Sequence, residues 1–150
     1  MNNMQIKQIK DNKKQFLDLL LLADEQEDMI DKYIYRGDMF ALYDDDIKTI
    51  CVITDEGNDT LEIKNIATYP NERRKGYASK LIAFLFNYYK GKGAFMQLGT
   101  GDVPSTIGFY EHCGFRRSHI VKDFFTNNYN HPMIEDGILL TDMIYLKKEL

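Results

Sequence analysis

The sequence predicts a mixed α/β fold, with a mostly antiparallel central sheet and helices on both of its faces. Short runs of alternating and β-branched residues, bounded by Gly, Pro and Asp, recur along the chain as strands do. One long segment, Ala78 to Tyr89, instead repeats its apolar residues with the period of a helix. The 150 residues are 44% hydrophobic and contain no long Gly/Ser/Pro linker, so we expect one compact domain over residues 1–150.

The first third of the chain predicts one strand and two helices. Met4 to Ile9 has the pattern of a short strand, and a first helix follows Asp11. Asp24 with Glu27 three residues later resembles a capping box, which predicts a second helix that ends at Arg36-Gly37. The apolar face of the first helix comprises Phe16, Leu19, Leu20 and Ala23.

The middle of the chain predicts consecutive antiparallel strands. Residues 39–43 (MFALY) and 48–54 (KTICVIT) flank the acidic stretch Asp44 to Asp46, which we expect to be a solvated hairpin turn. A second turn leads into the strand 61–68, LEIKNIAT. Its apolar residues change from odd to even positions at Ile66, and this change of parity predicts a β-bulge.

The second half of the chain predicts alternating helices and strands. In order, these are a helix at about 74–89, a strand at 94–98, a helix at about 104–113, and strands near 115–121 and 139–146. The two closing strands are separated by Asp123 to Gly137, which is longer than an ordinary hairpin loop. Loops of that length are usually functional or disordered.

The segment between the strand 61–68 and the next helix has the layout of an anion-binding site. Pro70 ends the strand because it lacks a backbone donor, and Gly76 and Ala78 put almost no side chain at the helix start. Free N–H groups there would point at a phosphate, and the helix dipole favours its charge. The three consecutive cations Arg73 to Lys75 disfavour a helix start, so a bound anion explains them better than solvation does.

Two motifs resemble those of a known enzyme superfamily. One motif resembles the signature of the GNAT superfamily of acetyl-CoA-dependent N-acetyltransferases. It consists of Arg73, Gly76 and Ala78, with two residues between the first pair and one between the second. That signature is Arg or Gln, two residues, Gly, one residue, and Gly or Ala. Phe109 to Arg117 (FYEHCGFRR) is similar to the family's helix that ends in Phe-Tyr, a few polar residues and Gly-Phe. With their spacing, the motifs cover residues 61–117.

The resemblance implies a GNAT-like fold that binds acetyl-CoA. In this family the bulged strand splays from the next strand, and the pantetheine arm bonds to the free edge. Many members bind pantetheine through an Asn after the second strand of the cleft, where this chain offers Asp102 or Ser105; an aspartate only accepts hydrogen bonds. The implied cofactor-binding residues are Ile66, Ala67, Thr68, Arg73, Arg74, Lys75, Gly76, Tyr77, Ala78, Ser79, Asp102 and Ser105.

The resemblance also implies direct acetyl transfer, in a ternary complex, to a primary amine of a small molecule or peptide. Tyr110 would protonate the departing thiolate, because a tyrosine with a pKa of about 10 stays protonated at neutral pH. Taken alone, Tyr110 is better explained as a packing residue beside Phe109, and it is the family motif that favours the catalytic role. The general base stays unassigned. In the family it is often a Glu or an ordered water near the bulged strand, and Glu62 is the candidate in this chain.

The acceptor amine is expected on the side of the closing strands and early helices, as the resemblance implies. Glu135 or Asp142 would attract a cationic amine there. The alternatives are a solvated loop packed by its own aromatics, and an acceptor pocket at the helix that contains Met29 and Tyr33. The implied acceptor-binding residues are Phe124, Phe125, Tyr129, Glu135 and Asp142.

Composition argues against several other functions. The net charge of −4 and pI near 5.4 disfavour a nucleic-acid surface. The longest apolar run, Leu19 to Ala23, is too short for a membrane span and the N-terminus lacks a signal-peptide layout, so we expect a cytoplasmic protein. Cys51 and Cys113 imply neither a disulfide framework nor a zinc site, and His119 and His131 lack ligand-spaced partners, so we expect no metal.

Two other functional classes remain open on the sequence. An acetyl-CoA-binding regulatory module would show slow acetyl-CoA hydrolysis and no response to any amine. A non-catalytic interaction domain that uses the sheet edge would show no thermal shift with CoA. The sequence is compatible with a homodimer and does not name the acceptor.

Overall fold

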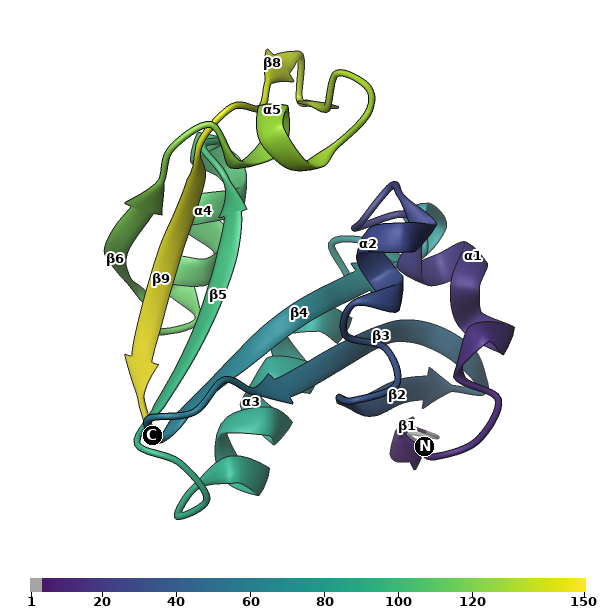
Figure 1. Cartoon of the computed structure of the whole chain (residues 1–150). Helices are drawn as coiled ribbons and strands as arrows, with labels where there is room; N and C mark the ends of the chain where they lie inside the picture. The colour runs from purple at the N-terminus through teal and green to yellow at the C-terminus, as the bar shows by residue number, and fades with distance from the viewer. Residues whose placement is uncertain (1–3) are drawn as a thin grey trace.

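The computed structural model describes residues 4–150 and confirms the mixed α/β fold. Seven strands form one sheet in the order β1-β2-β3-β4-β5-β9-β6, in which β4 and β5 are parallel and the other neighbours antiparallel (Figure 1). The strands are β1 (Met4–Ile9), β2 (Asp38–Asp44), β3 (Asp46–Asp55), β4 (Thr60–Thr68), β5 (Phe95–Gly101), β6 (Arg116–Val121) and β9 (Met143–Glu149), with β7 (Ile134–Glu135) and β8 (Ile138–Leu139) as a separate pair.

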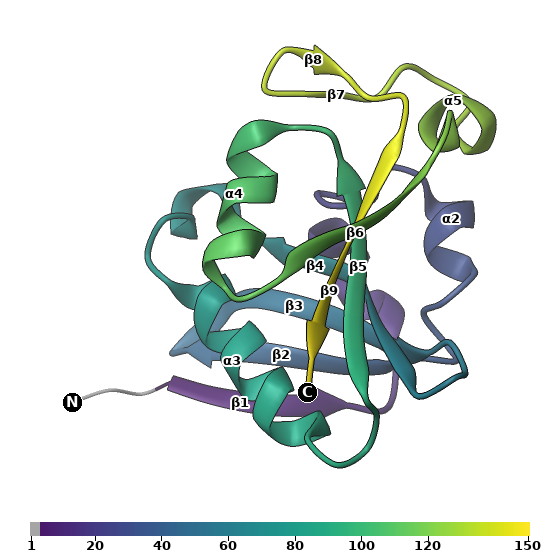
Figure 2. The ribbon, with the colours of Figure 1, turned by 90° about the vertical axis from the view of Figure 1, so that its left-hand side faces the viewer.

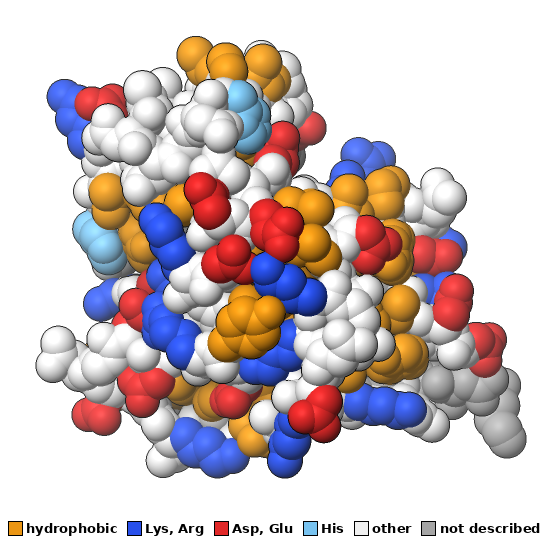
Figure 3. Space-filling model, turned by 45° about the vertical axis from the view of Figure 1, so that its right-hand side comes forward, with side chains coloured by type: hydrophobic (Ala, Val, Ile, Leu, Met, Phe, Trp, Pro, Cys, Tyr) orange, Lys and Arg blue, Asp and Glu red, His pale blue; other side chains and the backbone are white. Residues whose placement is uncertain are grey.

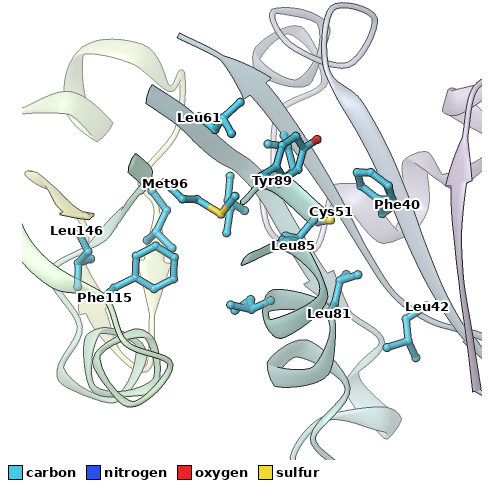
Figure 4. Packing of buried hydrophobic residues seen from close by; sticks show 14 of the residues in the cluster. Phe40, Leu42, Cys51, Leu61, Leu81, Leu85, Tyr89, Met96, Phe115 and Leu146 are labelled. Carbon is cyan, nitrogen blue, oxygen red and sulfur yellow. The ribbon is translucent and has the colours of Figure 1, made fainter. Parts of the chain in front are cut away.

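Helices cover both faces of the sheet, as the sequence predicts (Figures 1 and 2). Successive residues of β2 point to opposite faces, so Met39 packs with α1 and α2 whereas Phe40 packs with α3 (Figure 4). On α3, Leu81 and Leu85 lie toward the sheet at helical spacing. The helices are η1 (Lys13–Phe16), α1 (Leu17–Leu20), α2 (Glu27–Asp31), η2 (Pro70–Glu72), α3 (Tyr77–Tyr89), α4 (Pro104–His112) and α5 (Phe124–Asn128).

The bulge predicted in β4 is confirmed and lies at Lys64. Its neighbours Ile63 and Asn65 pair with the adjacent β3 residues Ile53 and Val52, so Lys64 is one residue too many for the ladder. An extra residue bends the strand that carries it.

The sheet opens immediately beyond this bulge. β4 pairs with β5 only as far as Ile63, which lies opposite Leu98, and β5 then continues paired with β9 as far as Gly101. The two halves of the sheet diverge as a V (Figure 1). The rest of β4 therefore keeps an edge that β5 does not pair.

The early helices are shorter than predicted, and the capping-box prediction at Asp24 is wrong. α1 and α2 span four and five residues, and the N-cap residue of α2 is Gln26, which makes no side-chain cap bond. Asp24 is buried and instead accepts hydrogen bonds from the hydroxyls of Tyr33 and Tyr129. Tertiary contacts have replaced the local cap.

Three other boundaries differ from those predicted. α3 begins at Tyr77 rather than near residue 74, because Arg74 (φ 63°) and Gly76 (φ 85°) take left-handed conformations. The last strand begins at Met143, since residues 138–139 belong to β8. The segment 123–137, expected to be a loop, contains α5 and β7.

Candidate active site

A cleft of about 930 Å³ follows the opening between β4 and β5. Its walls come from both strands, from the segment 73–79, from α4, from α5 and the β7 segment, and from the stretch 22–36 that contains α2. Parts of the chain that are far apart in sequence therefore surround one cavity. Both apolar and polar side chains line it, and a concave cavity where polar groups converge is the usual place for a small-molecule site.

Most residues expected to bind the cofactor line this cleft. Lys75 and Asp102 do not: Lys75 is exposed and ion-paired with Glu72 at 2.9 Å, and Asp102 is exposed beyond the end of β5. Ser105 lines the cleft, but its hydroxyl donates to Asp136 Oδ2 at 2.7 Å. The lining residues of this group are Ile66, Ala67, Thr68, Arg73, Arg74, Gly76, Tyr77, Ala78, Ser79 and Ser105.

The start of α3 has the properties of an anion site. Gly76 has a φ of 85° and nothing within 4 Å of the place where a Cβ would stand, so the space above the helix start is open. Arg73 and Arg74 line the cleft, and neither forms an ion pair with any residue that the structure describes. Free helix N–H groups beside two uncompensated cations favour a phosphate.

The acidic turn between β2 and β3 is exposed at Asp45 and Asp46, as expected, but Asp44 and Asp46 also support this loop. Asp44 accepts a hydrogen bond from the Tyr77 hydroxyl at 2.7 Å. Lys48 Nζ lies 2.6 Å from Asp46 and 3.3 Å from Glu72, the residue that also holds Lys75. The turn therefore fixes both sides of the loop.

Tyr110 lines the cleft from α4 with a hydroxyl that is not otherwise engaged. Its ring packs against Phe109 and Phe115, with centroids 5.2 and 6.1 Å away, and its hydroxyl makes no hydrogen bond within residues 4–150. Burial, with smaller contributions from Glu135 and Cys113, raises the pKa of Tyr110 well above its ordinary value. The phenol is therefore protonated at neutral pH.

The residues expected on the acceptor side are brought only partly together. Phe124, Phe125, Tyr129 and Glu135 line the cleft, whereas Asp142 does not. Asp142 accepts a hydrogen bond from the backbone N–H at position 123, and Glu135 accepts one from a hydroxyl of α4. Asp142 therefore acts at the start of α5.

Sequence reasoning missed a buried polar network in the same wall. Tyr33 donates to Asp24 Oδ2 at 2.8 Å and accepts from Asn65 Nδ2 at 3.0 Å, and all three residues line the cleft. The available signal was Asn65, because Asn is depleted in strands and here lies in the middle of one. The network also engages Tyr129, whose hydroxyl donates to Asp24 Oδ1 at 2.6 Å.

Other kinds of site find no support in the described residues. Residues 4–150 contain no group of three or more His, Cys, Asp or Glu side chains placed to hold a metal. None of the helices described is long and apolar enough to cross a membrane. On the face shown in Figure 3, basic and acidic side chains are intermixed.

Comparison with known proteins identifies the family. Residues 35–117 match the family described as Acetyltransferase (GNAT) domain. A Bacillus subtilis (strain 168) protein named Uncharacterized N-acetyltransferase YvbK is 31% identical over 153 residues, which cover 100% of this chain and 99% of the relative.

Two solved structures agree closely with the fold. A GNAT family acetyltransferase from Elizabethkingia anophelis with acetyl-CoA bound has a TM-score of 0.93 and 33% identity over 100% of both chains. A Bacillus subtilis acetyltransferase in complex with CoA has a TM-score of 0.90 and 30% identity over 99% of both chains. The chain belongs to the GNAT family of acetyltransferases.

Proposed function

We propose that this protein transfers an acetyl group from acetyl-CoA directly to a primary amine of a small molecule or peptide bound in the same cleft. Acetyl-CoA is the cosubstrate, as the family and the relatives solved with acetyl-CoA or CoA support. The observation that carries the proposal is the single cleft that both the segment 73–79 and Tyr110 line. One cavity thus contains an anion site and a proton donor.

The proposed position of acetyl-CoA follows from cations that form no ion pair among residues 4–150 and from a strand edge that β5 does not pair. The helix start at Gly76, with Arg73 and Arg74, would bind the pyrophosphate. The edge of β4 at residues 66–68, which β5 leaves unpaired, would bind the amides of pantetheine. This arrangement directs the thioester toward the opening of the V.

The proposed chemistry assigns a role to each end of the thioester. A backbone N–H of β4 would polarise the carbonyl, and Tyr110 would donate its proton to the departing sulfur. Glu62 is this chain's candidate for the Glu that often acts as the base in the family. It lies in the cleft wall but is ion-paired with Lys64 at 2.8 Å. In that ion pair the carboxylate is already neutralised by a cation.

A thiol-release assay tests the proposal. Acetyl-CoA is supplied with spermidine, lysine, kanamycin and a tetra-alanine peptide, and release of free CoA is followed. We expect release that depends on one of these amines, with intersecting initial-velocity lines. Parallel lines with an acetylated protein would contradict direct transfer, whereas amine-independent hydrolysis would favour the regulatory module.

A further inference from the structure

Most carboxylates in the cleft wall are neutralised by a cation or hydrogen-bonded by an α4 hydroxyl. Glu62 is ion-paired with Lys64, and Glu72 lies between two lysines. Glu135 and Asp136 accept hydrogen bonds from hydroxyls at the start of α4. These groups are already engaged in holding the walls together.

Asp24 is the buried exception. Its side chain lies in the cleft wall, the residue is only 8% exposed, and its two oxygens accept hydrogen bonds from the hydroxyls of Tyr33 and Tyr129. No Lys, Arg or His within residues 4–150 forms an ion pair with it. A carboxylate removed from water without a counter-ion is costly, and a cation that reaches it is bound strongly.

Asn65 provides a second, independent sign of a missing ligand. Its Nδ2 donates to the carbonyl of Leu20 and to the Tyr33 hydroxyl, both at 3.0 Å. Its Oδ1 is buried and has no hydrogen-bond partner in the described part of the chain. The binding capacity left on Asn65 and Asp24 therefore consists only of acceptors. A positively charged N–H donor, such as an ammonium, is the kind of group that acceptors of this kind bind.

This cluster lies where the acceptor nitrogen is needed. Asn65 follows the bulge residue Lys64 directly, at the point where β4 leaves β5. A single phenol oxygen, that of Tyr33, joins the Asn65 amide to Asp24. An ammonium bound here lies beside the part of β4 that we assign to the pantetheine arm.

We propose that Asp24 binds the ammonium of the acceptor amine and takes its proton. The inference rests on the proposed function and completes it with a base. An N–H bond breaks, its electron pair stays on nitrogen, and the proton passes to a carboxylate oxygen of Asp24. The nitrogen then attacks the thioester carbon, and the carbon–sulfur bond breaks with its pair on sulfur, which takes a proton from Tyr110. The second nitrogen proton leaves as the intermediate collapses and, through solvent, restores Tyr110. Asp24 releases the first proton to solvent once the products have left, which restores the carboxylate.

The surroundings of Asp24 suit this role. Burial raises the pKa of Asp24, hydrogen bonds from Tyr129 and Tyr33 and the charge of Lys32 oppose that rise, and Asp28 adds to it. A carboxyl with a raised pKa accepts a proton more readily than an ordinary one. Because the ionised form is required, activity should fall as the pH falls through this raised pKa.

Asp24→Asn is the direct test, with kcat/KM for the amine measured against pH. At neutral pH we expect a fall of about two to four orders of magnitude, the usual range for general acid–base catalysis. The variant should recover as the pH approaches the pKa of the amine, because the substrate then arrives already neutral. The thermal shift produced by acetyl-CoA should be unchanged, which also shows that the variant folds.

Two further variants separate catalysis from packing. Tyr129→Phe removes one donor to the carboxylate, so it should move the acidic limb of the wild-type pH profile to higher pH without abolishing turnover. Asp38→Asn removes a carboxylate that also binds a tyrosine hydroxyl but lies outside the cleft wall, and should leave the profile unchanged.

The outcomes distinguish this inference from the proposed function. An active wild type whose pH profile is the same in Asp24→Asn would overturn the role of Asp24. The role of Asp24 would also be overturned if Glu62→Gln lost the acidic limb of the pH profile while Asp24→Asn kept it. A wild type that acetylates no amine of the panel at any pH would overturn the proposed function and this inference together.

Discussion

At the scale of single residues, surroundings decide what chemically similar groups do in this cleft. Glu62 and Asp24 are both buried carboxylates, yet one is paired with Lys64 and the other only with neutral phenols. Tyr110 differs from the tyrosines that hold Asp24, because its hydroxyl has no partner among the described residues. A cation-free carboxylate and a free phenol are the groups best suited to accept and to donate a proton.

Tyr110→Phe tests the proposed acid. We expect kcat to fall by about one to three orders of magnitude, because the hydroxyl is used mainly in the transition state. The affinity for acetyl-CoA should barely change. Cys113→Ala is the control, since Cys113 does not line the cleft; loss of activity with this variant and an acetylated wild type would contradict direct transfer.

Gly76→Glu tests the anion site. The new carboxylate would occupy the open space above the helix start and repel the pyrophosphate, so calorimetric titration should show acetyl-CoA binding lost or weakened at least tenfold. The left-handed backbone adds strain of roughly 1–2 kcal/mol for any side chain. Gly91→Glu carries the same strain, with a φ of 82° in open space at the far end of α3, and should bind acetyl-CoA normally. Equal affinities in the two variants would move the cofactor elsewhere.

At the scale of elements, α3 is fixed to both ends of β2. Tyr77 in its first turn donates to Asp44, and Tyr89 in its last turn donates to Asp38, each at 2.7 Å. Only the first of these contacts is next to the cleft, because Tyr77 lines it and Tyr89 does not. The helix start that we assign to the phosphates is thus held in place by the β2–β3 turn.

Asp44→Asn and Asp38→Asn form a matched pair that tests this positioning. Each loses a charged hydrogen bond, and we expect each to lower the free energy of unfolding by about 1–3 kcal/mol. Only Asp44→Asn should also weaken acetyl-CoA binding, by several-fold in a titration. Equal effects on affinity would mean that the β2–β3 turn supports stability alone.

The elements that the sequence predicts well are those whose own pattern decides their structure. β1 and α3 follow the periods of strand and helix, and the parity change near Ile66 gave the bulge. The short helices and the segment 123–137 were predicted poorly, because long-range contacts decide them. Asp24 illustrates this: a local cap was expected, but its partner Tyr129 lies 105 residues away.

The candidate site likewise contains residues that a local sequence motif predicts and residues that only long-range contacts bring together. The loop residues around Gly76 and the position of Tyr110 followed from motifs, whereas the Asp24 cluster followed from none. Its members come from three separate parts of the chain, and only folding brings Asp24 and Tyr33 together with Asn65 and Tyr129. Local patterns therefore point to the loop residues and Tyr110, whereas the Asp24 cluster is visible only in the folded structure.

At the scale of the whole molecule, the two arms of the V are joined across the part of the cleft that we propose for the acceptor. Tyr129 binds Asp24, and the backbone N–H of Asn130 donates to Gln26 Oε1 at 3.1 Å. The helices α5 and α2 stand on opposite arms in Figure 1. A ligand that contacts β4, the loop 73–79 and α4 together would add a second connection between the arms.

The most direct test of the account is the stability of the whole protein with and without acetyl-CoA. A ligand that binds only the folded state adds about 2.7 kcal/mol at a hundredfold excess over its dissociation constant, roughly 5–10 °C in Tm for a chain of this size. We predict such a shift in the wild type and none in Gly76→Glu. A wild type with an unchanged Tm at millimolar acetyl-CoA would contradict the assignment of the cleft.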